Sequence, residues 1–242
     1  MIVDILQWLV SAEEWSGDGG ILVRLLEHIA YTFMVILLAG LVAIPAGLWI
    51  GHTGRGRWMV TVANALRAIP TLGLLFALTL VLLPRLPGAS AFIVPSIAVL
   101  VLLAIPPILS GTYSGVESAD PAALDAAKGM GMTGRQVLRS VEIPIALPLL
   151  ISGIRAAVLQ VVATATIAAY VGLGGLGRYL IDGLAISDYV STAGGALLVA
   201  LLALALDAPF ALLGRYLVSP GLTGRTPRAL RQTDPLPAGG TA

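Results

Sequence analysis

Residues 114–144 read SGVESADPAALDAAKGMGMTGRQVLRSVEIP, which is the longest polar stretch inside an otherwise apolar chain. The sequence before it, ending near residue 113, and the sequence after it, starting near residue 145, are both apolar over long distances. A helix needs about 20 apolar residues to cross the hydrocarbon core of a bilayer. The polar stretch therefore predicts a segment at a membrane face that connects two transmembrane helices.

Local signals within this segment predict a helix, a turn and a second helix. Asp120-Pro121 is a favourable helix start, and the following PAALDAAK favours helix throughout. Three glycines then break the helix, and Thr133 is placed to cap a second short helix that Pro144 would end. The pair should present charged side chains to the cytoplasm for docking of a soluble partner. These side chains are Asp125, Lys128, Arg135 and Arg139.

The composition indicates an all-α membrane protein. Hydrophobic residues make up 57% of the 242 residues and charged residues only 11%, with a mean hydropathy of +0.94. Soluble domains carry about 25% charged residues. Backbone groups in lipid must bond internally, so each apolar stretch is interpreted as a helix. The five expected spans are residues 29–50, 58–83, 91–113, 145–171 and 190–218.

The distribution of basic residues predicts the orientation in the membrane. Connections on one side carry nine Lys or Arg residues and those on the other side carry three. Because the richer side faces the cytoplasm, we expect the N-terminus outside and the C-terminus inside. The cytoplasmic set is Arg55, Arg57, Lys128, Arg135, Arg139, Arg215, Arg225, Arg228 and Arg231, and the outer set is Arg24, Arg85 and Arg178.

Three parts of the chain are expected from these patterns. Residues 1–28 would be an external N-terminal segment, residues 29–218 the transmembrane domain, and residues 219–242 a disordered cytoplasmic tail rich in Pro, Gly, Thr and Arg. Residues 1–20 hold four acidic and no basic residues, so we expect no signal peptide there.

Several function classes are disfavoured by what the sequence lacks. It has no cysteine and only two histidines, so we expect no disulfide, no metal site and no cysteine nucleophile. No basic run interleaved with aromatic residues suggests nucleic-acid binding. The only lysine, Lys128, is not part of a Gly-x-x-x-x-Gly-Lys-Ser/Thr phosphate loop, so the chain is not expected to hydrolyse ATP itself. We predict no catalytic residues and no bound cofactor.

The polar segment resembles the coupling loop of ATP-binding-cassette (ABC) importer permeases. That pattern is Glu-Ala-Ala, three residues, Gly, nine residues, then Ile-x-Leu-Pro. This chain has Asp125-Ala126-Ala127, Gly131 and Val141-Glu142-Ile143-Pro144 at the same spacing. The resemblance implies a type I ABC importer permease fold whose short helix docks into a cleft of an ATP-binding subunit. The implied coupling residues are Asp125, Ala126, Ala127, Lys128, Gly129, Met130, Gly131 and Pro144.

Flanking motifs resemble permeases for osmoprotectants such as glycine betaine, carnitine, choline and proline. They are AIPTL at 68–72, PILSGTYSG at 107–115, KGMGM at 128–132 and ATIAAYVGLGGLG at 165–177. The resemblance covers residues 21–215, although Gly111 stands where the family has Asn, and we expect that change to affect a local turn. It implies ABC ATPase subunits that carry ATP and Mg²⁺, a second permease copy or paralogue, and an external solute-binding protein.

Three ionisable residues, Arg67, Arg155 and Asp207, fall near the middle of expected spans. Charges facing lipid are costly, so these side chains should face the bundle interior. They either pair structurally, as Arg155 or Arg67 with Asp207, or line the solute pathway. Small residues at four-residue spacing predict close helix packing in the first and fifth spans. They are Ala39, Ala43 and Gly47, and Ala196 and Ala200.

The glycine run at 172–177 is interpreted as a flexible external turn that lets residues 178–188 fold over the pore mouth. Two other functions stay open at this point. An ABC permease for an amino acid such as methionine would share the coupling loop, but should lack the motifs at 112–115 and 165–177. An ion-coupled secondary transporter would normally show more spans and an inverted repeat.

Overall fold

The computed structural model describes residues 1–217, and every regular element in that range is a helix. Four helices are long and apolar enough to span a membrane, and a bent pair adds a fifth candidate span. The predicted tail at 219–242 lies outside the described residues. The long helices are α3 (Ile21–Thr53), α6 (Ser90–Glu117), α9 (Ile143–Ala168) and α11 (Tyr189–Leu217).

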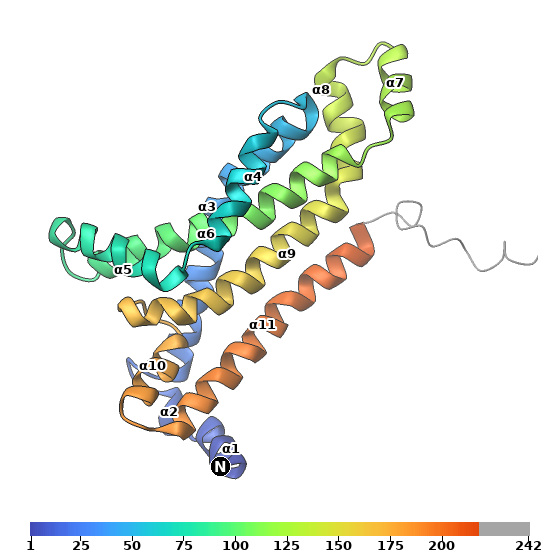
Figure 1. Ribbon diagram of the computed structural model, residues 1–242. Helices are drawn as coiled ribbons and strands as arrows, with labels where there is room; N and C mark the ends of the chain where they lie inside the picture. Colours follow the sequence, from blue (N-terminus) through green and yellow to red (C-terminus); the bar gives the residue numbers. More distant parts are fainter. Residues whose placement is uncertain (218–242) are drawn as a thin grey trace, which may run out of the picture.

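The long helices run side by side and the connecting segments gather at the two ends of the bundle (Figure 1). The N-terminal helices α1 (Ile2–Val10) and α2 (Ala12–Trp15) lie at one end with α10 (Gly177–Ala185). The polar segment, with α7 (Pro121–Gly129) and α8 (Gly134–Val137), lies at the opposite end. The helix–turn–helix expected from the sequence is therefore a projection at one tip of the molecule.

The first span begins earlier than its hydropathy predicts. Helix α3 starts at Ile21, whereas the apolar stretch starts near residue 29. Its first turns contain Arg24 and Glu27. An unpaired charge near the start of a membrane span would be unfavourable, but these two side chains form an ion pair of 2.9 Å. Because each charge has a partner, the helix continues through them.

The second expected span is broken in two. Helix α4 (Arg57–Ala65) continues through the 3₁₀ turn η1 (Leu66–Ala68), and α5 (Thr71–Leu82) then leaves at 92°. Pro70 has no N–H and restricts the residue before it to extended conformations, and Ile69 has φ −73° and ψ 129°. Figure 1 shows α5 projecting sideways from the bundle. The continuous helix predicted for 58–83 is therefore wrong.

Pro144 does not end a helix, contrary to the expectation. Helix α8, the π-helical turn η3 (Leu138–Glu142) and α9 follow one another directly, so that residues 134–171 form one rod of 38 residues. Pro144 occupies the start of α9, immediately after the π turn. A π turn already shifts the hydrogen-bond register, so the missing proline N–H is accommodated without ending the helix.

The core is formed where α3, α6 and α9 cross, and small residues allow the close approach. Ala39, Ala43 and Gly47 are buried on α3, as predicted, and a Cβ on Gly47 would lie 2.7 Å from the Thr112 Cβ. Gly111 belongs to the crossing of α6 with α9, because its Cβ would lie 2.6 Å from the Leu149 carbonyl oxygen. The expectation that Gly111 alters a local turn is therefore wrong.

In α11 the small residues that pack are different from those predicted. Ala196 and Ala200 are exposed within this chain. Their neighbours Gly194 and Gly195 are buried instead, the first against the Trp8 ring and the second against Tyr179. A glycine has no Cβ, so it lets α1 and α10 lie closer to α11 than alanine would.

A matched pair of glycine substitutions tests this helix crossing. Gly111→Ala should lower the free energy of unfolding by about 1–3 kcal/mol, because the new methyl group meets backbone atoms of α9 that cannot rotate away. Gly40→Ala is the control, since its Cβ would meet only the Ile44 side chain, at 3.7 Å. Thermal denaturation in detergent compares them, and equal effects on both would contradict this role of Gly111.

Candidate functional site

The first half of the polar segment is a short capped helix followed by a tight turn. The Asp120 carboxylate accepts a hydrogen bond from the Ala122 N–H at 2.9 Å, which confirms the predicted N-cap of α7. After the helix, Gly131 has φ +85°, a conformation that glycine adopts without strain. The turn is closed by hydrogen bonds from the N–H of Gly131 to the Lys128 carbonyl, 2.9 Å, and from the N–H of Met132 to the Ala127 carbonyl, 3.2 Å.

Most of the predicted coupling residues lie on the outer surface of this projection. Ala127 alone among them is buried, and its carbonyl accepts the hydrogen bond from the Met132 N–H. The Asp125 and Lys128 side chains are exposed, and Met130 is 77% exposed although it is apolar. Met130 stands between Gly129 and Gly131 on the same exposed surface. The exposed members of the predicted set are Asp125, Ala126, Lys128, Gly129, Met130, Gly131 and Pro144.

The second half of the segment is attached to α3 by a buried contact that the sequence did not reveal. The Glu142 carboxylate lies 2.6 Å from Nδ1 of His52, and the Glu142 side chain is only 6% exposed. Glu142 occupies the variable position of the Val141–Pro144 pattern, where a carboxylate between apolar residues is a signal of a buried partner. The partner, however, is 90 residues away in sequence, so no local pattern identifies it.

Two further contacts fix this end of the molecule. The backbone N–H of Thr133 donates to Oε1 of Gln136 at 2.7 Å, as in a capping box at the start of α8. Arg57, the first residue of α4, forms an ion pair of 2.8 Å with Glu117, the last residue of α6. The start of α8 is thereby capped, and the first residue of α4 is held to the last residue of α6 at the same end of the molecule as the projection.

The three ionisable residues predicted within the spans do not form one group. Arg155 pairs with Asp207 through two parallel hydrogen bonds, one of them 2.6 Å from Nη2 to Oδ2. This pair connects α9 to α11 and confirms structural pairing for these two residues. Arg67 lies apart from them, with its guanidinium 3.5 Å from Oε1 of Gln160. Near it, Asn64 donates a hydrogen bond to the Ser110 hydroxyl at 3.1 Å.

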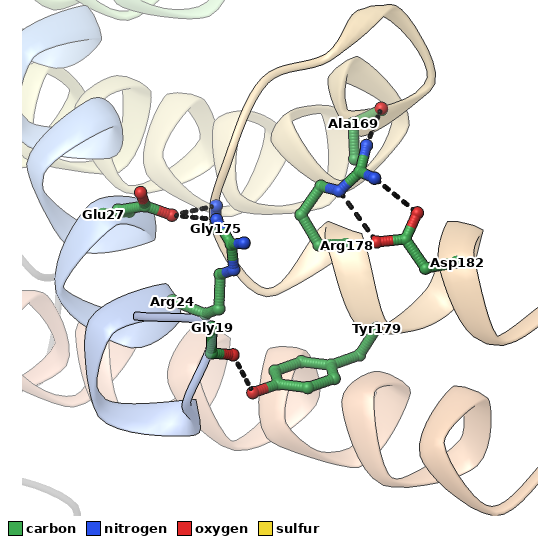
Figure 2. A network of polar contacts seen from close by, with 8 residues as sticks. All are labelled: Gly19, Arg24, Glu27, Ala169, Gly175, Arg178, Tyr179 and Asp182. Carbon is green, nitrogen blue, oxygen red and sulfur yellow. Dashed lines mark hydrogen bonds and ion pairs between the residues drawn. The ribbon is translucent and has the colours of Figure 1, made fainter. Parts of the chain in front are cut away.

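At the opposite end, Glu27 attaches the glycine run to the start of α3 (Figure 2). Its carboxylate accepts hydrogen bonds from Arg24, 2.9 Å, and from the backbone N–H of Gly175, 2.8 Å. Gly175 has φ +88°, and Leu173 and Leu176 on either side are fully buried. The run is therefore packed against the bundle, where the sequence predicts a loose turn.

Helix α10 is fixed beside this run by its own polar contacts. The Tyr179 hydroxyl donates to the Gly19 carbonyl at 2.8 Å, and Arg178 pairs with Asp182 at 2.5 Å (Figure 2). Burial raises the pKa of Tyr179, and the negative charge of Glu14 raises this pKa further, so Tyr179 stays a neutral donor at physiological pH. Among residues 1–217 no cluster of three or more His, Cys, Asp or Glu could hold a metal ion.

Comparison with known proteins adds independent information. The family model for the binding-protein-dependent transport system inner membrane component matches residues 43–219. The glycine betaine/carnitine/choline transport system permease protein OpuCB of Bacillus subtilis is 32% identical over 210 residues, which is 86% of this chain and 94% of that protein. The osmoprotectant import permease protein OsmW of Salmonella typhimurium is 35% identical over 185 residues, covering 75% and 84%.

The solved structures give the same fold. A chain of the MetNI methionine ABC transporter, in an inward-facing conformation, superposes with a TM-score of 0.72 over 82% of this chain and 96% of that chain. Its sequence identity is 23%, so the likeness concerns the fold alone.

A double-mutant cycle tests the contact between His52 and Glu142. His52→Ala should cost about 1–3 kcal/mol of stability, because it leaves a buried carboxylate without its partner. Adding Glu142→Ala should then cost less than it does alone, with a coupling energy of about 0.5–3 kcal/mol. Thermal unfolding of the four proteins in detergent measures this energy, and additive effects would show that the two side chains do not interact.

Proposed function

The chain belongs to the binding-protein-dependent transport system inner membrane components, and we propose that it is the permease subunit of an ATP-driven importer for compatible solutes. It is a multi-pass inner-membrane component of a transport system. We propose that it forms part of the pore and leaves ATP hydrolysis to a partner subunit. The observation that carries the proposal is identity of 32% over 86% of the chain to a permease named for glycine betaine, carnitine and choline. We include proline among the candidate solutes because the sequence motifs resemble that wider class.

In the proposed mechanism, the exposed projection at residues 125–131 docks into a cleft of the ATP-binding subunit. ATP and Mg²⁺ would be held by that subunit, and this chain would bind no cofactor. When the subunits close, the projection moves and the rod formed by residues 134–171 carries the motion into the membrane as a rigid body. The buried contact of Glu142 with His52 passes the same motion to α3.

The chain would work with three kinds of partner: ABC ATPase subunits, a second permease that is a copy or a paralogue, and an external solute-binding protein. The aromatic content of 6% is low for a cage that selects quaternary ammonium groups by cation–π attraction. Tight selection is therefore assigned to the binding protein, and the permease provides a gated path.

Two of the other functions weighed from the sequence are less well supported. A methionine permease would share this fold, but the chains of the methionine transporter are 23–25% identical, whereas the two osmoprotectant permeases above are 32% and 35% identical. An ion-coupled secondary transporter would have no use for the exposed projection.

Reconstitution tests the function directly. Proteoliposomes that contain this permease, its second permease, the ATPase subunits and the binding protein should accumulate glycine betaine, and omission of ATP or of the binding protein should stop uptake. Uptake that runs on a sodium or proton gradient without ATP would refute the proposal. Binding of glycine betaine to the isolated permease at micromolar or tighter affinity would refute the assignment of selection to the binding protein.

Variants of the projection serve as controls in the same assay. Gly131→Leu and Asp125→Arg should abolish uptake and the stimulation of ATP hydrolysis while leaving the permease in the membrane. Gly131→Leu forces a side chain into φ +85°, and Asp125→Arg reverses an exposed charge. Gly19→Ala, outside the projection, is the control and should transport normally, because the φ of Gly19 is not positive and its Cβ would meet open space.

The proposed orientation places residues 1–28 outside and the projection in the cytoplasm. Because the sequence contains no cysteine, single cysteines can be introduced without background. Cysteine at Gly19 should react in intact cells with a membrane-impermeant thiol reagent, and cysteine at Thr133 should react only after the membrane is opened. The reverse pattern would overturn the orientation.

A further inference from the structure

Four polar side chains from four helical elements meet near the bend of the broken span. We call Asn64, Arg67, Ser110 and Gln160 the mid-membrane polar cluster. Asn64 lies on α4 and Arg67 one turn later on η1, Ser110 lies on α6 and Gln160 on α9. Asn64 bonds Ser110 at 3.1 Å, and Arg67 approaches Gln160 at 3.5 Å. The cluster lies among apolar helices, so it forms a polar face where lipid would be unfavourable.

The Gln160 amide has a defined orientation. Its NH₂ group donates to the Leu103 carbonyl at 2.9 Å. That carbonyl would bond the N–H four residues later in α6, but residue 107 is proline and has none. Gln160 therefore satisfies a carbonyl that the helix leaves open, and its Oε1 must point toward Arg67.

Arg67 has donor capacity beyond this one contact. A guanidinium has five N–H donors in a planar fork, and the contact with Gln160 is a long hydrogen bond. Within residues 1–217, no carboxylate lies within 4.0 Å of the Arg67 guanidinium, whereas Arg155 in the neighbouring span has two bonds to Asp207. The Arg67 side chain is exposed in the single chain. It is thus an accessible cation about ten residues, or roughly 15 Å, into its span.

We propose that the mid-membrane polar cluster is a contact point of the solute path and that Arg67 binds the carboxylate of the solute as it passes. The inference rests on the proposed function and narrows its substrate class. A planar guanidinium matches a carboxylate with two parallel hydrogen bonds. Asn64, Ser110 and Gln160 offer neutral hydrogen-bond partners on the same face, so the carboxylate meets a positive charge without a fixed counter-ion.

This arrangement discriminates between the candidate solutes. Glycine betaine, carnitine and proline carry a carboxylate, whereas choline carries a hydroxyl group and a net positive charge. Arg67 attracts the first group and repels choline. The permease therefore favours carboxylate-bearing zwitterions during translocation, whichever solutes the external binding protein delivers.

In the assembled transporter, the other candidate partner of the Arg67 guanidinium is a carboxylate of the second permease. The two partners predict different results. A structural pair with the second permease would affect all solutes alike, and a contact with the solute affects only those that carry a carboxylate.

The test uses the complete transporter in proteoliposomes, with glycine betaine and choline at saturating concentrations and the same binding protein throughout. Arg67→Gln should lower glycine betaine uptake about tenfold, as expected for loss of a charge-assisted bond, and leave choline uptake unchanged or higher. Gln160→Glu should act in the same direction, because a fixed carboxylate then occupies Arg67. Arg85→Gln, at the other end of the same broken span, is the control and should leave both rates unchanged.

The outcomes separate the inference from the function on which it rests. A fall in the ratio of glycine betaine to choline uptake, with ATP hydrolysis still stimulated by the binding protein, supports the proposal. Equal loss of both uptake rates, loss of ATPase stimulation, or no change in either rate overturns it. If the unmodified transporter imports neither solute, the proposed function itself fails.

Discussion

The hydrocarbon core of a membrane offers no hydrogen-bond partner, so every polar group inside the spans must be satisfied by the protein or by water in a path. This constraint explains most of the polar contacts in the bundle. The Arg155 guanidinium and the Asp207 carboxylate bind each other, and the Gln160 amide binds the Leu103 carbonyl that Pro107 leaves open. Arg67 differs from these groups because it has no carboxylate partner among the described residues. By the same constraint, its guanidinium should face water rather than lipid.

Helix association obeys a related rule. Lipid chains are as apolar as leucine, so helices in a membrane gain little from the hydrophobic effect and depend on close packing. Gly47, Gly111 and Gly153 are placed where a Cβ would meet another helix at 2.6–2.7 Å. Their absence of a side chain allows α3, α6 and α9 to form one tightly packed unit. Helix α11 joins that unit from one side through the Arg155–Asp207 pair, and its Gly194 and Gly195 pack against α1 and α10.

The sequence predicted the helices and the coupling segment well, because both depend on local signals. Hydropathy located each long helix, and Asp120 and Gly131 have the conformations that their residue types favour. The effect of the prolines was not predictable in the same way. Pro70 marks a 92° bend, whereas the helix passes Pro144 through a π turn, and only the surrounding packing decides between these outcomes.

Local sequence patterns also could not predict contacts between residues that are far apart in the chain. From the sequence, Asp207 could form an ion pair with either Arg67 or Arg155. The structure shows that α9 and α11 bring it together with Arg155. Glu142 stands between apolar residues, which indicates a buried partner, but His52 is 90 residues away and no local pattern identifies it. Two side chains can form a buried pair only if their helices cross at the right place. Small residues determine where the helices cross, but such residues are common throughout this chain, so the sequence alone does not identify the crossing.

The connectivity of the bundle relates the coupling segment to the mid-membrane polar cluster. Gln160 belongs to the same helical rod of 38 residues that begins at Gly134 in the projection, so one continuous helix connects the projection to Gln160. Arg67 belongs to the broken span, whose 92° bend lies just after it, and its contact with Gln160 is long. A continuous helix and a bent one thus meet at this contact.

Under the proposed function, the position where solute carboxylates bind is also the position where motion driven by the ATPase would change the distance between the two helices. Binding and release of solute would then be coupled to ATP hydrolysis without a tight binding site in the permease. A weak contact between Arg67 and the solute is sufficient, because the helix motion itself breaks it.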